Sequence, residues 1–303
     1  MICVFRKSVF AALCAVMLVS GCKTLEGGGF NQLLSTAAGS AGAGAGVTAG
    51  MQSAVAGATD LFREYTPEEQ QRLGADFASV LLGARPLVRN PAAQRYVNQV
   101  GVWVVQQTAQ PTDGRGRPMI KTWRFGIIDS EAVNAYATPG GYVFITKGLF
   151  KKLGSEAELA GVLSHEIAHV TQGHYLAAIK AGGFSKIMAG AVQAGTGDKR
   201  LDEAAANLVR NLYAKGLDKS DEYEADRLGM LYAARAGYEP TGLMSVLHLY
   251  AAHTRGDDGF QLLFATHPDP KDRIARLEPL LVTFATASDA TNAQRFKAVQ
   301  ARL

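Results

Sequence analysis

Apolar residues recur at helical spacing along several stretches of this chain, and some of these stretches begin with a helix-start signal. Residues 66–67 (Thr-Pro) and 90–91 (Asn-Pro) place a capping residue before a proline, and Ser155 with Glu158 has the spacing of a capping box. The patterns predict helices over residues 66–83, 90–110, 155–182, 220–237, 239–253 and 269–281, with another from about Asp202.

Three short runs between the second and third of these helices have a different character. Residues 123–130, 132–139 and 141–148 are rich in β-forming residues, and a Pro-Gly-Gly turn separates the last two. They follow a polar turn at residues 111–118. Helices therefore dominate, one small sheet interrupts them, and the predicted fold class is α+β and mostly helical.

The N-terminus has the pattern of a secretory targeting segment, predicted to comprise residues 1–21. Arg6 and Lys7 precede a short apolar run, which ends in “VSGC” at Cys22. This ending resembles a bacterial lipobox, so Cys22 is the predicted lipidation site. Lys23 favours the outer membrane by the same resemblance. An ordinary signal peptide with a chance cysteine and an uncleaved inner-membrane anchor are the alternatives.

The composition indicates a globular protein and argues against nucleic acid as a partner. The chain is 48% hydrophobic and 19% charged, as in a globular protein with a sizeable core. Removal of Arg6 and Lys7 with the targeting segment lowers the formal net charge from +4 to +2, too little to indicate nucleic-acid binding. All three cysteines lie within the first 22 residues, so no disulfide is expected in the mature body.

Four segments follow from these patterns. After the targeting segment, residues 22–59 are rich in Gly, Ala and Ser and are expected to be a lipid-anchored tether, although Gly42, Gly46 and Gly50 have the spacing of close helix packing at a membrane. Residues 60–281 are expected to be the folded domain, and residues 282–303 a C-terminal tail. The glycine-broken stretch 182–198 is a candidate flap over a site.

His165, Glu166 and His169 spell H-E-x-x-H within the predicted helix over residues 155–182. Residues four apart lie about 40° apart around a helix, so both histidines can bind one ion. Glu166 is placed to act on a water molecule at the metal instead of binding the metal itself. If the helix continues, His174 lies about 180° from His165, and we expect it to face away from the metal.

A third ligand must come from another segment, since two histidines and one carboxylate form a known catalytic zinc set. The stretch “SDEYEAD” offers Asp221, Glu222, Glu224 and Asp226. Glu222 and Asp226 share a helix face, while Glu224 points roughly 200° away from Glu222. This face is expected to supply a ligand, with Asp226 accepting the free N–H of a zinc-bound histidine.

The segments “HEIAHVTQGH” and “EYEADRLG” together resemble the HtpX and CAAX-prenyl-endopeptidase family of gluzincin zinc metallopeptidases. The lipobox, with no later apolar run of membrane length, resembles the periplasmic lipoprotein branch of that family, the LoiP and BepA types. The resemblance implies a zincin-like peptidase domain, with an active-site helix and a small sheet bordering the cleft. It also implies one Zn²⁺ per chain on His165, His169 and Glu222. The family often has an arginine just before the Glu222 helix, where this chain has Lys219.

Two further segments match the family. The stretch “NAYATPGGYVFITKGL” resembles the strand that borders its cleft, which makes Asn134, Gly140 and Gly141 candidates for substrate binding. The Pro-Gly-Gly turn is equally explained as a hairpin connection. The stretch “THPDPKDRI” resembles a motif near the catalytic centre, so His267 is expected within reach of the metal, either as an oxyanion donor or in zinc's open position. A helix-start histidine without chemical role is the alternative.

These features predict a zinc endopeptidase that hydrolyses misfolded cell-envelope proteins through a zinc-activated water, with Glu166 as general base. Its partners would be polypeptide substrates and, through the lipid anchor, the membrane on the periplasmic side. The rival interpretation is a chaperone-like or binding lipoprotein of envelope quality control, in which zinc is structural or latent. The sequence leaves substrate identity and oligomeric state open.

Overall fold

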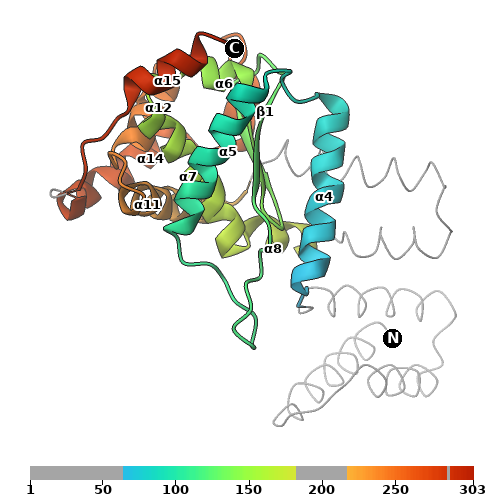
Figure 1. The fold of residues 1–303 in the computed structure, drawn as a ribbon. Coiled ribbons are helices and arrows are strands. Elements are labelled where there is room, and N and C mark those ends of the chain that lie inside the picture. The colour runs from blue at the N-terminus through green and yellow to red at the C-terminus, as the bar shows by residue number, and fades with distance from the viewer. Residues whose placement is uncertain (1–63, 182–216, 285–286) are drawn as a thin grey trace, which may run out of the picture. The chain divides into compact units, whose positions relative to one another are not determined.

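Helix α7 (Glu156–Gln172) occupies the core, and all of its residues except Glu158 and Gln172 are buried (Figure 1). The computed structural model describes residues 64–181, 217–284 and 287–303, which belong to one unit starting at Thr59. Helices α5 (Pro91–Gln106), α11 (Lys219–Arg235) and α12 (Gly242–Ala251) and one small sheet pack around α7. The described residues are mostly helical, so the predicted α+β class is confirmed.

The first two predicted helices are α4 (Pro67–Ala84) and α5 (Pro91–Gln106). Thr66 and Glu69 form a capping box at the start of α4, and the side chain of Asn90 caps α5. Each cap satisfies backbone N–H groups that the first helical turn leaves without a partner. The start signals therefore located both helices correctly.

The sheet contains β1 (Arg124–Ile128), β2 (Ala135–Thr138) and β3 (Tyr142–Thr146) in the order β1-β3-β2. Strand β3 runs parallel to β1 and antiparallel to β2, so β2 lies at an edge of the sheet. Each strand falls within one of the three predicted runs. The third run ends earlier than expected because Thr146 caps a short helix, α6 (Lys147–Lys152).

The predicted helix over residues 155–182 is broken at Gly173. Gly173 has φ +74°, which caps α7 in the left-handed conformation, and α8 (His174–Ala181) begins immediately afterwards. At the start of α7, Ser155 accepts from Glu158 N–H, whereas the Glu158 carboxylate accepts from Gly154 N–H. The prediction of one continuous helix over residues 155–182 was wrong. Glycine adopts the left-handed capping conformation without strain, and Gly173 ends the helix in this way.

The C-terminal half supplies α11 (Lys219–Arg235), α12 (Gly242–Ala251), α13 (Gln261–Thr266) and α14 (Pro270–Leu277). The sequence patterns predicted three of these and missed the short α13. Helix α11 approaches α7 closely at Gly229, where a Cβ atom would lie 3.0 Å from the backbone nitrogen of His165. This contact brings the acidic face of α11 against the H-E-x-x-H motif.

Residues 282–303 are not a tail, contrary to the sequence prediction. After the 3₁₀ helix η1 (Glu278–Phe284), α15 (Ala293–Gln300) packs on the fold and buries Phe296 completely beside Phe150 and Tyr96. Arg295 donates to the carboxylate of Glu156 at the first residue of α7. The segment belongs to the domain because it covers apolar core residues and pairs a buried carboxylate.

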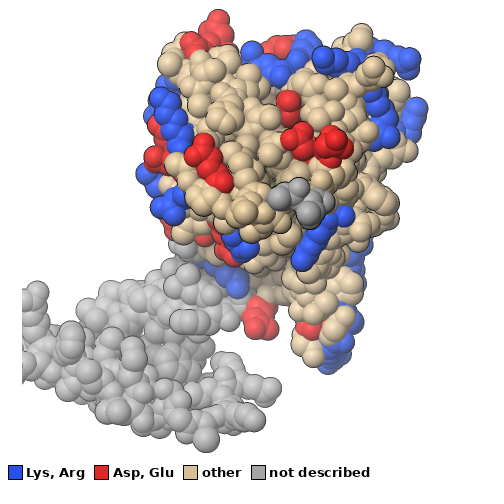
Figure 2. Space-filling view, turned by 90° about the vertical axis from the view of Figure 1, so that its left-hand side faces the viewer, with Lys and Arg blue, Asp and Glu red and all other residues tan. Residues whose placement is uncertain are grey.

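Several predictions concern residues outside the described ranges: the targeting segment, Cys22, the tether, the candidate flap over residues 182–198 and the helix from Asp202. Within the described ranges, each helix is too short or too polar to cross a bilayer. The face in Figure 2 carries acidic and basic side chains in small groups, separated by areas of other residues.

Replacement of Phe296 by alanine tests whether α15 is part of the core. We expect Phe296→Ala to lower the free energy of unfolding by about 3–5 kcal/mol, because it removes a fully buried ring. Val282, 78% exposed, provides the control, and Val282→Ala should change stability by less than about 0.5 kcal/mol. Urea unfolding of the purified domain measures both; equal stabilities would contradict the packing of α15.

Candidate metal centre

His165 and His169 project from one face of α7 into a shared space. Their Nε2 atoms lie 3.1 Å apart, and their rings are nearly perpendicular, at 85°. Both side chains are buried, and burial lowers the pKa of His165 to about 4. The Nε2 lone pair of His165 is therefore available at neutral pH, as metal binding requires.

Glu222 on α11 points its carboxylate at the same space. One of its oxygens lies 3.7 Å from His165 Nε2, and the other lies 3.5 Å from His169 Nε2. Ligand atoms about 2.1 Å from a tetrahedral zinc ion lie roughly 3.4 Å from one another. The two Nε2 atoms are 3.1 Å apart, and each has a different oxygen of the Glu222 carboxylate at 3.5 or 3.7 Å, which is close to the spacing of donors around one zinc ion.

His267, the C-cap residue of α13, reaches the same centre. Its Nδ1 donates to Glu222 across 2.8 Å, and its ring centre lies 6.0 Å from that of His165. His165, Glu222 and His267 each offer a ligand atom within 4.8 Å of the others. The structure thus brings His267 beside the predicted ligands, and its charge with that of His169 keeps the pKa of Glu222 well below its usual range despite burial.

Asp226 lies one helical turn after Glu222 and accepts a hydrogen bond from His165 Nδ1 at 2.9 Å. Arg273 on α14 donates to both oxygens of Asp226, at 2.8 and 2.6 Å. Burial opposes the charge of Asp226, but Arg273 and His165 together lower its pKa to about 2. The bond to Nδ1 fixes the ring of His165 with Nε2 directed at the centre.

Arg273 is the functional residue that the sequence reasoning missed. It is 3% exposed, and its guanidinium also lies 3.7 Å from a Glu222 oxygen. Lys219, which stands where the family often has an arginine, is exposed. Its position in the sequence could have indicated this role, because Arg273 follows His267 by six residues in the segment that resembles the family motif.

His174 does not face away from the centre, contrary to the sequence prediction. Its Nδ1 lies 2.9 Å from Nδ1 of His169, and its Nε2 lies 3.4 Å from a Glu224 oxygen. The break at Gly173 redirects the chain, so the angle calculated for a continuous helix does not apply. His174 therefore contacts Nδ1 of the predicted ligand His169, as Asp226 contacts Nδ1 of His165.

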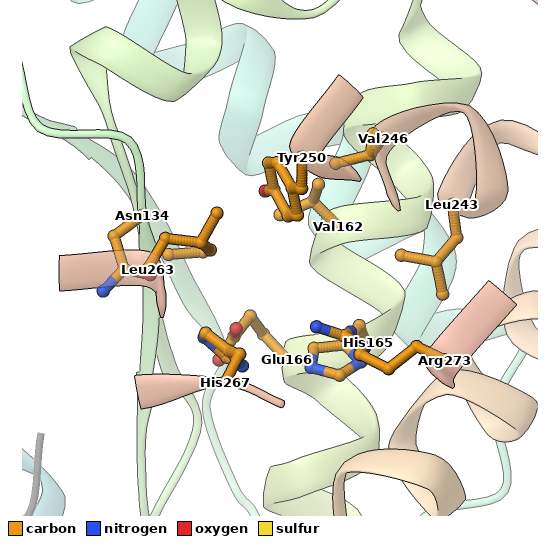
Figure 3. Close-up of a pocket in the computed structure, with 11 residues that line it drawn as sticks. Asn134, Val162, His165, Glu166, Leu243, Val246, Tyr250, Leu263, His267 and Arg273 are labelled. Atoms are coloured by element: carbon orange, nitrogen blue, oxygen red, sulfur yellow. The ribbon is translucent and has the colours of Figure 1, made fainter. Parts of the chain in front are cut away.

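Glu166 is buried, and this burial raises its pKa. The hydroxyl of Tyr175 donates to its carboxylate at 3.4 Å. In Figure 3, the Glu166 side chain lies between His165 and His267 and faces a recess lined partly by Asn134 and Tyr250. A carboxylate in this position, next to the ligands but outside the ligand set, has the geometry of a general base.

The structure separates the three residues proposed for substrate binding. Asn134 lines the recess beside Glu166, and its Oδ1 is buried without a hydrogen-bond partner among the described residues. Gly140 and Gly141 form the β2–β3 turn with φ +75° and +92°, and a Cβ on Gly140 would lie 2.6 Å from Cα of Gln71 on α4. The hairpin explanation therefore accounts for both glycines.

The chain matches the sequence profile of Peptidase family M48 over residues 91–280, a range that contains every residue of the centre described above. The chain belongs to Peptidase family M48. The family resemblance inferred from the two motifs is thereby confirmed.

Relatives include a “Beta-barrel assembly-enhancing protease” of Escherichia coli (strain K12), 26% identical over 68% of this chain and 42% of that protein. A “Putative beta-barrel assembly-enhancing protease” of Vibrio cholerae is 30% identical over 69% of this chain and 43% of that protein. A “Protease HtpX homolog” of Salinibacter ruber is 31% identical over 51% of this chain and 66% of that protein. The chain thus spans less than half the length of the first two relatives.

Arg273→Met tests whether the ion pair between Arg273 and Asp226 supports metal binding. It leaves the Asp226 carboxylate buried without its cation, so we expect zinc affinity to fall by about 10–100-fold. Competition with a chromogenic chelator measures the affinity. Arg276→Met is the matched control, because Arg276 is on the same helix but exposed, with its guanidinium 4.0 Å from the Tyr223 ring centre. Equal affinities in the two variants would contradict the role of Arg273.

Proposed function

We propose that this chain is a zinc-dependent endopeptidase in which His165, His169 and Glu222 bind the metal and Glu166 is the general base. The observation that carries the proposal is the position of Glu166 beside two imidazoles and one carboxylate whose donor atoms approach one another to 3.1–3.7 Å. Membership of Peptidase family M48 supports the same function. Two histidines and one carboxylate also match the donors of catalytic zinc sites.

Zinc bound there would polarise the scissile carbonyl and lower the pKa of a water molecule toward neutrality. Glu166 accepts the proton of the attacking water and delivers a proton to the leaving amine. Its buried position supports this role, since burial raises its pKa and favours the protonated intermediate form of the side chain. Asp226 and Arg273 hold His165 in the orientation that binding requires.

His267 is proposed to act on the reacting groups, either by donating to the oxyanion or by occupying the open coordination position and keeping the enzyme latent. Its 2.8 Å contact with Glu222 supports a position within reach of the metal. His267→Ala should therefore alter both peptidase activity and the zinc environment. Unchanged activity and an unchanged metal spectrum would reject this role.

An extended substrate is proposed to bind beside Asn134, directly before the start of β2. The buried Oδ1 of Asn134 supports a role as an acceptor for a substrate N–H.

The proposed site of action is the periplasmic side of the bacterial cell envelope, with the chain anchored to the outer membrane through lipidated Cys22. The lipobox-like “VSGC” supports the anchor. The name of the E. coli relative, a β-barrel assembly-enhancing protease, supports a role in envelope quality control. We propose misfolded envelope polypeptides as substrates.

Glu166→Gln tests the chemistry directly. The variant should bind zinc with parent stoichiometry and lose about 10²–10⁴-fold in kcat, because the amide cannot accept the proton of water. Peptide cleavage and metal analysis on purified protein measure the two properties. Glu131→Gln, an exposed surface change, is the control. Parent-level cleavage by Glu166→Gln would refute the assignment.

The same variant separates the endopeptidase from the chaperone-like alternative. In cells lacking the gene, Glu166→Gln should fail to restore the envelope phenotype if cleavage is the function. Full complementation by Glu166→Gln, with normal zinc content, would favour a binding role with structural or latent zinc.

Cys22→Ala tests the anchor. The parent chain should label with a radioactive fatty acid and fractionate with outer membranes, because acyl chains supply the membrane affinity. Cys22→Ala should lose the label. Cys14→Ala, within the predicted targeting segment, is the matched control and should behave as the parent. Labelling of Cys22→Ala would contradict the lipidation site.

A further inference from the structure

A small apolar recess lies directly beside Glu166, one helical turn toward the start of α7 (Figure 3). Val162, four residues before Glu166, forms part of its wall. Leu243, Val246 and Tyr250 on one face of α12 also line it. The recess therefore adjoins the proposed general base, and His165 and His267 are part of its lining.

The recess is small and its apolar walls are buried. Its volume is about 20 Å³, whereas a single water-sized group occupies roughly 10–15 Å³ by the same measure. Val246 is 0% exposed and Leu263 is 4% exposed, so these side chains already pack against the core. An alanine methyl or a serine hydroxymethyl group fits such a space, but an isobutyl or benzyl group requires the walls to move.

Charge also restricts the occupant. The lining residues that carry a charge or a titratable imidazole are His165, Glu166, His267 and Arg273, and Arg273 is engaged by Asp226. The wall formed by Leu243, Val246 and Val162 is apolar. A charged substrate side chain placed against this wall would lose its hydration without gaining a partner, so such substrates are disfavoured.

The position of Glu166 identifies which substrate residue enters. The general base passes a proton to the leaving amine, so the nitrogen of the scissile bond lies next to the Glu166 carboxylate. The side chain closest to this nitrogen belongs to the residue that becomes the new N-terminus. The recess begins one turn from Glu166 and is therefore in reach of that side chain.

We propose that this recess selects substrates with a small uncharged residue, alanine or serine, immediately after the scissile bond. The inference rests on the proposed peptidase function and specifies its substrate class. The size limit is set by Val246 and Leu263, and the exclusion of charge follows from the apolar wall.

Cleavage of a peptide series by the zinc-loaded chain tests the inference. The peptides differ only in the residue after one scissile bond: alanine, serine, valine, leucine, phenylalanine or lysine. The parent should cleave the alanine and serine peptides with kcat/KM at least about 10-fold above the leucine peptide, since a misfitting methylene costs about 10-fold or more. Val246→Ala should raise the leucine-to-alanine ratio of kcat/KM by about 10-fold.

Val97→Ala is the matched control, because Val97 on α5 is equally buried and does not line the recess. It should lower stability without changing the ratio. Leu263→Ala gives a second enlargement if Val246→Ala does not fold. Parent preference for leucine or phenylalanine, or an unchanged ratio in the enlarged variants, would overturn the inference alone. Failure to cleave any peptide would reject the proposed function and the inference with it.

Discussion

The buried ionic contacts between three helices are the interaction on which the site depends. Asp226 is only 1% exposed and lies between His165 and Arg273. An unpaired carboxylate at this depth would be strongly destabilising, so α11 and α14 must both pack against α7 for the charge to be satisfied. The same packing positions Glu222, because it lies one turn from Asp226 on the same face. The packing of the three helices therefore also positions the side chains of the candidate metal centre.

Each proposed ligand histidine is held at its outer nitrogen by a neighbour. Asp226 occupies Nδ1 of His165, and His174 occupies Nδ1 of His169. Both Nε2 atoms are left directed at the shared space, which reduces the rearrangement that metal binding requires. The opposite end of α7 is secured differently, by Arg295 on α15 at Glu156. Helix α7 thus carries the proposed ligands in its second half and a structural ion pair at its first residue.

Site residues that share one helix at a spacing of four were predictable from the sequence. The four-residue spacing placed His165 with His169, and Glu222 with Asp226, on common helix faces, whereas the family resemblance identified Glu222 as the predicted ligand. Predictions failed where a single residue changed the course of the chain. Gly173 ends α7 and turns His174 back, and a glycine after a polar residue does not by itself mark the break. Arg273 was missed because a lone arginine near a helix start is usually solvated, and only tertiary packing buries it.

We propose that His165, His169 and Glu222 hold the zinc ion, and a crystal structure with anomalous data at the zinc edge tests this ligand set directly. We expect one strong peak per chain, about 2.0–2.2 Å from Nε2 of both histidines and from a Glu222 oxygen. A peak ligated instead by His174, or no zinc between α7 and α11 in metal-loaded crystals, would contradict it.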